Sequence, residues 1–124
     1  MASVGRTKWA IAEGYIPGES HGRAPAMTSH EACCILNASE KEAHVSITIF
    51  FEQRDPVGPY HFTISRRRTR HLRFNNFNDP ETIPRDTPYS SLIESDVPIV
   101  VQHTRLDSRQ SENALLTTIA FPCN

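Results

Sequence analysis

The clearest strand signal in the chain is AHVSITIFF, residues 43–51. Apolar and polar residues alternate through it, and the apolar positions are Val45, Ile47, Ile49 and Phe51. The intervening positions are polar except for Phe50. A period of two residues is typical of a strand with one buried face, so this stretch predicts a half-buried β-strand.

Similar patterns follow on the C-terminal side. After a turn at 55–59, which contains two prolines and a glycine, Tyr60, Phe62 and Ile64 alternate with polar residues. Residues 69–74 repeat the alternation, with His71 on the polar face. These segments predict two more strands, joined by short turns.

Short runs rich in β-branched and aromatic residues extend the pattern in both directions. They lie at Thr7–Ala12, Glu31–Leu36, Tyr89–Glu94 (a weak strand or a helical turn) and Pro98–Leu106. Nine prolines, mostly between these runs, favour turns and strand ends. We therefore predict an all-β fold: one antiparallel β-sandwich domain over residues 1–124, jelly-roll-like, with about eight short strands.

Two segments are harder to assign. Asp107–Gln110 fits the cap of a helix over Ser111–Ala120, but the alternating apolar residues from Leu115 to Phe121 fit a strand. We prefer the strand, because the β-branched residues favour it. Asn75–Pro88 predicts a long irregular loop, a kind of segment that is often functional.

The composition narrows the class of protein. The chain has 124 residues, 38% of them hydrophobic, and a net charge of −1, which argues against a surface built entirely for nucleic acid. No apolar stretch approaches the ~18 residues of a membrane span, and the start of the chain lacks a signal-peptide pattern. Three cysteines, two of them adjacent, make a poor disulfide framework. These features predict a cytoplasmic protein with reduced thiols.

Polar residues at the end of the 98–106 strand form the first candidate site. His103 and Arg105 share a face, and Asp107 joins them if the strand continues. Their donors and acceptors suit a hydroxyl-rich or anionic small molecule, although an internal ion network would have the same pattern.

Two further pairs extend this candidate site. In the first pair, the Trp9 ring would stack on a sugar ring and the Glu13 carboxylate would hydrogen-bond its hydroxyls; the alternative is that Trp9 is a core residue. His30 with Glu31 either supplies another donor–acceptor pair or caps a turn.

A basic segment is the second candidate. It comprises Arg66, Arg67, Arg68, Arg70 and Arg73. It could contact phosphates, or it could be a solvated strand edge whose charge discourages edge-to-edge pairing. We find no catalytic set, metal-ligand spacing or cofactor motif, so we expect neither an enzyme nor a metal or cofactor site.

Six motifs run through nearly the whole chain: Gly5–Thr7, Trp9–Pro17, His30–Glu31, Pro56–Tyr60, Pro98–Gln110 and Asn113–Leu116. Together they resemble the Anabaena sensory rhodopsin transducer family. The resemblance implies a small soluble cytoplasmic β-sandwich that assembles as a homotetramer. It also implies signalling with a retinal-binding membrane photoreceptor or binding of small molecules such as sugars, and it leaves a DNA-binding role open.

The residues of the candidate ligand site match motif positions of that family. They are Trp9, Glu13, His30, Glu31, His103, Arg105 and Asp107. We therefore expect a non-enzymatic module that binds a small polar ligand (a sugar or sugar acid), a membrane photoreceptor, or both. The alternative is a DNA-binding transcriptional regulator that acts through Arg66–Arg73.

Overall fold

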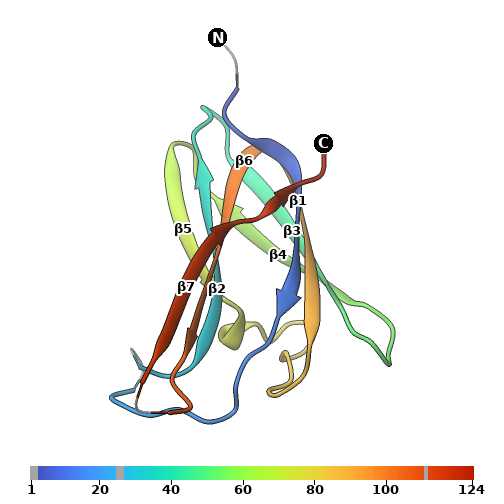
Figure 1. The fold of residues 1–124 in the computed structure, drawn as a ribbon. Coiled ribbons are helices and arrows are strands. Elements are labelled where there is room, and N and C mark those ends of the chain that lie inside the picture. The colour runs from blue at the N-terminus through green and yellow to red at the C-terminus, as the bar shows by residue number, and fades with distance from the viewer. Residues whose placement is uncertain (1–2, 25–26, 111) are drawn as a thin grey trace.

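The computed structural model describes residues 3–24, 27–110 and 112–124, which form eight antiparallel strands and one short 3-10 helix (Figure 1). The strands are β1 Arg6–Gly14, β2 His30–Asn37, β3 Ala43–Phe50, β4 Val57–Ile64, β5 Arg68–Arg73, β6 Tyr89–Asp107, β7 Ala114–Ile119 and β8 Phe121–Pro122; the 3-10 helix is η1 Phe74–Asn76. The predicted all-β, antiparallel fold is confirmed. No helix in the described part of the chain is long and apolar enough to cross a membrane.

Strand β6 organises the two layers of the fold. The sequence predicts two separate elements here, 89–94 and 98–106, but residues 89–107 form one continuous strand of 19 residues. Its first half pairs with β1 and β3, and its second half with β2 and β7. Pro98 lies between the two halves. The pairing of β6 with β1 ends at Ile99, and its pairing with β2 begins at Val100. A proline has no N–H to donate, so it is tolerated where the strand changes partners.

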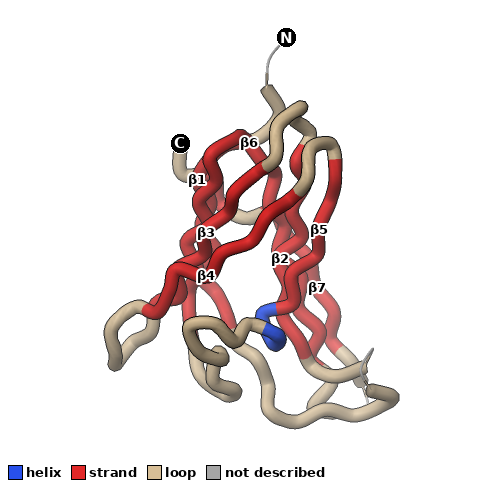
Figure 2. The backbone as a smooth tube through the Cα atoms, turned by 180° about the vertical axis from the view of Figure 1, so that it is seen from behind, coloured by secondary structure: helices blue, strands red, loops and turns tan. Residues whose placement is uncertain are grey.

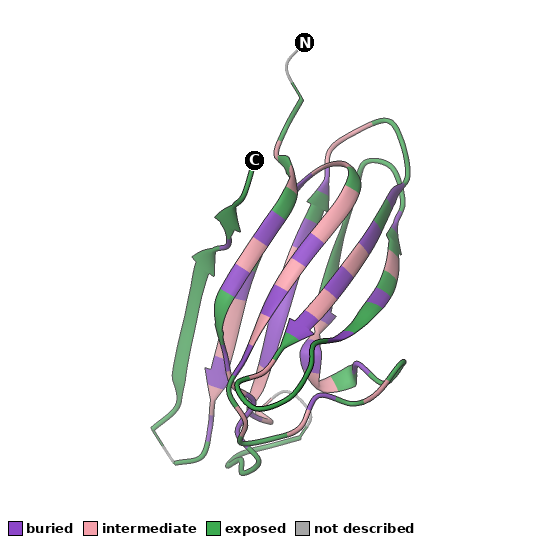
Figure 3. Ribbon diagram, turned by 90° about the vertical axis from the view of Figure 1, so that its right-hand side faces the viewer, coloured by how far each residue is buried: buried purple, intermediate pink, exposed green. Residues whose placement is uncertain are grey.

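The resulting layers face each other across one core. One layer has the order β4-β3-β6-β1-β8, and the other contains β5, β2, the second half of β6, and β7 (Figure 2). Buried and less buried residues alternate along the strands (Figure 3). On β3 the predicted apolar face is confirmed: Val45, Ile47 and Ile49 are buried, and Phe51 lies half-buried just past the strand end.

The C-terminal segment is a strand, as preferred from the sequence. Strand β7 covers Ala114–Ile119 and pairs with Gln102–Asp107 of β6; Ser111, the first residue of the alternative helix, lies outside the described residues. All six residues of β7 are exposed. Leu115 and Ile119 are 71% and 58% exposed, so this edge presents apolar side chains to solvent.

The long loop predicted at 75–88 begins within η1 and returns to the core. Phe77 and Ile83 are buried, and Phe77 packs against the rings of Tyr60, Phe62 and Phe74 at centroid distances of 4.9–5.0 Å. Burial of these side chains anchors the loop at two points.

Candidate functional site

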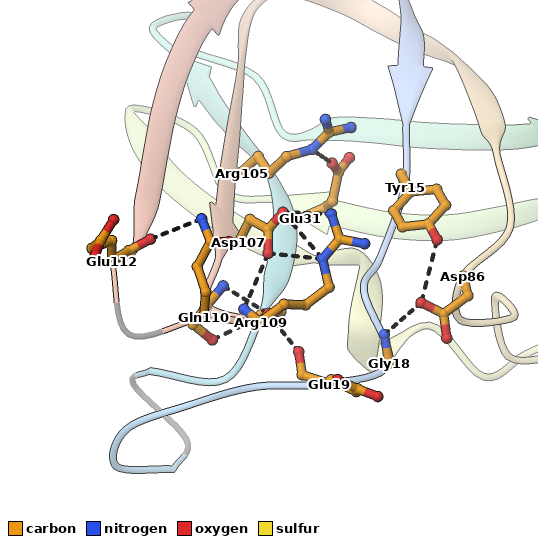
Figure 4. A network of polar contacts seen from close by, with 12 residues as sticks. Tyr15, Gly18, Glu19, Glu31, Asp86, Arg105, Asp107, Arg109, Gln110 and Glu112 are labelled. Carbon is orange, nitrogen blue, oxygen red and sulfur yellow. Dashed lines mark hydrogen bonds and ion pairs between the residues drawn. The ribbon is translucent and has the colours of Figure 1, made fainter.

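A buried carboxylate is the centre of the candidate site. Glu31 on β2 has no exposed side-chain surface. Its Oε1 accepts hydrogen bonds from Nε2 of His103 at 2.9 Å and from the Tyr89 hydroxyl at 3.2 Å. Its Oε2 accepts a hydrogen bond from Nε of Arg105 (Figure 4). A buried carboxylate is tolerated only when it is paired and hydrogen-bonded in this way.

Strand register explains why these residues meet. Glu31 is directly opposite Arg105 in the β2–β6 ladder, and Cys33 is opposite His103. Side chains on one face lie opposite or diagonal to each other, so Glu31 reaches both Arg105 and His103. Glu31, His103 and Arg105 are among the residues that the sequence predicts for one pocket, and the structure brings these three together.

Tyr89 was not predicted from the sequence. It belongs to the first half of β6, in the other layer, and its hydroxyl crosses the core to Glu31. Burial, and then the neighbouring Glu31 carboxylate, raise the pKa of Tyr89 far above its usual value. Gly14 makes room for the ring, because a Cβ at that position would lie 2.5 Å from it. The contacts of Tyr89 with Gly14 and Glu31 arise from packing between the two layers, so no local sequence pattern predicts them.

The guanidinium nitrogens of Arg105 are only partly paired with acceptors. Its Nη1 lies 3.7 Å from Oε1 of Glu13 on β1, whose side chain is 80% exposed. Its Nη2 is buried and has no hydrogen-bond partner among the described residues. Buried polar groups are nearly always paired, so an unpaired guanidinium nitrogen indicates a place where a further acceptor is missing.

A pocket of about 260 Å³ adjoins this network between β1 and β7. It is lined by Ala10, Ile11, Ala12, Glu13, His103, Thr118, Ile119, Ala120 and Phe121. Apolar walls with a few polar groups are typical of small-molecule sites. Glu13 and His103 supply the polar groups, and His103 links the pocket to Glu31 and through it to Arg105.

The structure places Trp9 in the core and apart from this network. Trp9 is 5% exposed, and its Nε1 donates to the carbonyl oxygens of Arg6 and Ile99, both at 3.0 Å. The indole thus ties the start of β1 to β6, and its face is covered.

Asp107 forms a local ion pair and is not joined to Arg105 by a hydrogen bond. Its carboxylate accepts from Nε and Nη2 of Arg109, at 3.0 and 2.7 Å (Figure 4). The Arg109 side chain, as its hydrogen-bond donor, lowers the pKa of Asp107. The Arg109 guanidinium also stacks over the ring of Tyr15, whose hydroxyl donates to Asp86. This network connects the end of β6 to Tyr15, just after β1, and to Asp86, just before β6.

His30 lies on the opposite face of β2 from Glu31. Its ring Nδ1 donates to the carbonyl oxygen of Thr28 at 2.8 Å. Successive residues of a strand point to opposite sides, so two neighbours in the sequence cannot both face the core. His30 lines a different cavity, on the outside of the sheet.

The arginine segment is divided among several contacts. Arg66 and Arg67 both pair with Glu40, at 3.2 and 3.1 Å. Arg70 donates to the carbonyl oxygen of Thr63 and lies over the Phe62 ring, and Arg68 donates to the carbonyl oxygen of Arg67. Arg73 lines the outer cavity with His30. No group of three or more His, Cys, Asp or Glu residues in the described ranges is arranged to hold a metal ion.

Comparison with known proteins places the chain in a family. A model of the Anabaena sensory rhodopsin transducer family matches residues 4–122. The solved structure of the Anabaena sensory rhodopsin transducer is 54% identical and has a TM-score of 0.73; the match covers 84% of this chain and 100% of that one. The crystal structure of Thermotoga maritima 1070 is 37% identical with a TM-score of 0.86, and the match covers 96% of both chains.

The search of curated proteins found no significant match. The family model extends over nearly the full length, and the two solved structures share both sequence and fold with this chain. The resemblance seen in the sequence motifs is thereby confirmed. The chain belongs to the Anabaena sensory rhodopsin transducer family.

Proposed function

We propose that this protein is a non-enzymatic signalling module that binds a small polar ligand, a sugar or sugar acid, in the pocket between β1 and β7. The observation that carries the proposal is a pocket lined by Glu13 and His103, both of which connect to Arg105: Oε1 of Glu13 lies 3.7 Å from its Nη1, and His103 shares the Glu31 carboxylate with it. The Nη2 of Arg105 is buried and unpartnered among the described residues. A ligand carboxylate or hydroxyl would supply the missing acceptor. The apolar walls would cover the C–H face of a sugar ring, and Glu31 would hold Arg105 and His103 in position.

Glu13 allows this proposal to be tested without disturbing the fold. A panel of neutral sugars and sugar acids, including glucuronate and galacturonate, is screened by thermal shift. A ligand that binds only the native state raises the melting temperature. Glu13→Ala removes a pocket carboxylate whose side chain is 80% exposed, so the fold should persist while the ligand-induced shift falls.

Glu112→Ala is the matched control. Glu112 is exposed and lies outside the pocket, and its backbone oxygen, not its side chain, accepts the hydrogen bond from Gln110. Its variant should keep the full ligand-induced shift. Absence of a shift with every sugar at millimolar concentration, or an equal loss in both variants, would contradict binding at this pocket.

We also propose that the protein acts in the cytoplasm as the partner of a retinal-binding membrane receptor. The support is the 54% identity to a protein named a sensory rhodopsin transducer. Titration against Anabaena sensory rhodopsin in lipid nanodiscs, in the dark and under illumination, tests this role. Saturable binding that differs between the two states is expected, and no binding in either state contradicts it.

For assembly we propose a homo-oligomer, specifically a tetramer, that covers the apolar residues of β7 and β8. The exposed side chains are Leu115, Leu116, Ile119 and Phe121. Exposed apolar side chains on an edge strand commonly mark a protein interface, and such a strand offers unpaired backbone groups to a second copy.

DNA binding through Arg66–Arg73 is the alternative function, and the geometry gives it less support. Two of its arginines are paired with Glu40, and a third donates to a backbone carbonyl. A gel-shift assay at low and high salt tests it. Retention that weakens as salt rises would favour DNA binding, and no retention at low salt would exclude it.

A further inference from the structure

A second cavity lies on the outer face of the sheet formed by β2, β5 and β6. Its volume is about 340 Å³, and it is lined by His30, Ala32, Cys34, His71, Arg73 and Thr104. Its residues come from the face of β2 opposite to Glu31, so it is separate from the pocket between β1 and β7. Figure 1 shows β5 and β2 side by side in this layer.

The register of three strands builds this cavity. Ala32 pairs with Arg73 on one side and with Thr104 on the other, and Cys34 pairs with His71. Residues paired across a ladder share a face, so the small Ala32 lies in a row between two larger side chains. The short alanine side chain accounts for the hollow at the middle of this surface.

The lining is rich in hydrogen-bonding groups and includes a positively charged guanidinium. It contains one guanidinium and two imidazoles, and neither Asp nor Glu is among its residues. Nδ1 of His30 is engaged by the Thr28 carbonyl, which leaves Nε2 for a ligand. Thr104 adds a hydroxyl, which donates a hydrogen bond to the Thr117 hydroxyl at 3.2 Å.

We propose that this cavity binds the phosphate group of a small phosphorylated molecule, with His30, His71 and Arg73 as its ligands. Arginine presents a planar fork of donors that matches phosphate oxygens, and histidine can add a donor from a second direction. The volume exceeds what one phosphate fills and lies within the range of sites for small organic ligands. The class is therefore a phosphate monoester, with the organic part over Ala32 and Cys34.

Cys34 supplies a direct probe of occupancy. Among the three free cysteines, Cys33 is buried, and burial strongly raises the pKa of its thiol, so it should not react with a thiol reagent. Cys123 is exposed and is removed by Cys123→Ser. The remaining reactive thiol, Cys34, lines the cavity, and a bound ligand should shield it.

The experiment measures the rate at which an uncharged pyridyl disulfide labels Cys34 in the Cys123→Ser protein. Glycerol 3-phosphate and inorganic phosphate are titrated separately, with chloride at matched ionic strength as the control. At ten times the dissociation constant the rate should fall about tenfold, because only the free form reacts. Line broadening of the ³¹P NMR signal of each probe reports binding independently of the thiol.

His71→Gln distinguishes this site from other basic surfaces. His71 is exposed, so its substitution should leave the fold intact while both protection and broadening are lost. His61→Gln, an exposed histidine on β4 outside the cavity, should bind like the parent protein. Binding of the ester but not of inorganic phosphate confirms the ester class, and binding of both confirms the phosphate site. No broadening with either probe, or broadening that survives both His71→Gln and Arg73→Ala, overturns the proposal.

Discussion

Nε2 of His103 donates a 2.9 Å hydrogen bond to Oε1 of Glu31, and both side chains are almost fully buried, at 5% and 0% exposure. The same carboxylate accepts from Tyr89 and from Arg105, so three donors converge on one buried acceptor. These donors come from both halves of β6, and each half belongs to a different layer. Glu31 therefore links the two layers of the fold, and its partner His103 lines the proposed ligand pocket.

Glu31→Gln is expected to lower the free energy of unfolding by about 3 kcal/mol. The substitution keeps the size of the side chain but removes the charge that Arg105 pairs with, and breaking a buried ion pair from one side costs roughly 3–5 kcal/mol. Urea unfolding followed by circular dichroism measures the change.

Glu40→Gln serves as the comparison for this prediction. Glu40 pairs with Arg66 and Arg67 on the surface, with 69% of its side chain exposed. Exposed ion pairs contribute about 0–1 kcal/mol, so this variant should unfold nearly like the parent protein. Equal stability losses in the two variants would show that Glu31 is not held as described.

The alternation of residues in the sequence predicted the strands better than it predicted the site. Period-two patterns identified β3 and β4 because one face of each is buried, and that face can be read locally. The same period separates His30 from Glu31, so grouping both in one pocket conflicted with the alternation itself. In contrast, the contact of Tyr89 with Glu31 spans 58 residues and depends on how the layers pack, which no local pattern encodes.

The sequence pattern also does not predict that β6 is one continuous strand. Pro98 favours a break between the two predicted elements. In the structure the proline lies where the strand exchanges its partners, so its missing N–H costs little. Predicting this would require knowing beforehand that both halves belong to different layers.

Trp9, the single tryptophan of the chain, is expected to behave as a core residue. Because it is 5% exposed, its fluorescence should be blue-shifted and quenched only weakly by acrylamide. Trp9→Ala should lower the free energy of unfolding by about 3–5 kcal/mol, the usual cost of emptying a large core position. Strong quenching that a bound sugar relieves would instead indicate that the indole contacts the ligand.

In the pair His44–Asp96, the pKa values of the two groups are expected to shift in opposite directions. Nδ1 of His44 donates to Asp96 at 2.7 Å, and this hydrogen bond, followed by the charge of Asp96, raises the pKa of His44 above 6.5. Burial alone would raise the pKa of Asp96, but hydrogen bonds from the backbone and ring of His44 outweigh it and lower that pKa below 3.8.

The sign of the pH dependence follows from these two shifts. The contribution of His44 to stability is complete below pH 6.5 and is lost as the pH rises through its raised pKa. That of Asp96 is complete above pH 3.8 and is lost as the pH falls through its lowered pKa. NMR titration should show the pKa of His44 returning toward 6.5 in Asp96→Asn, and decreasing less in Glu42→Gln, because Glu42 contributes less. An unchanged pKa in Asp96→Asn would refute the pairing.

Strand β7 is expected to hold the oligomer together. Leu115 and Ile119 are 71% and 58% exposed in the single chain, so replacing both with glutamate should cost the fold little. In an assembly the new carboxylates would be buried without partners, which is strongly unfavourable.

Light scattering at micromolar concentration should therefore give four times the 14.0 kDa chain mass for the parent protein and the mass of a single chain for Leu115→Glu/Ile119→Glu. Phe50→Glu, at an apolar position on β3 that is 39% exposed, is the control and should retain the parent mass. If the parent protein is itself a monomer, the apolar edge of β7 serves another partner and the proposed tetramer is wrong.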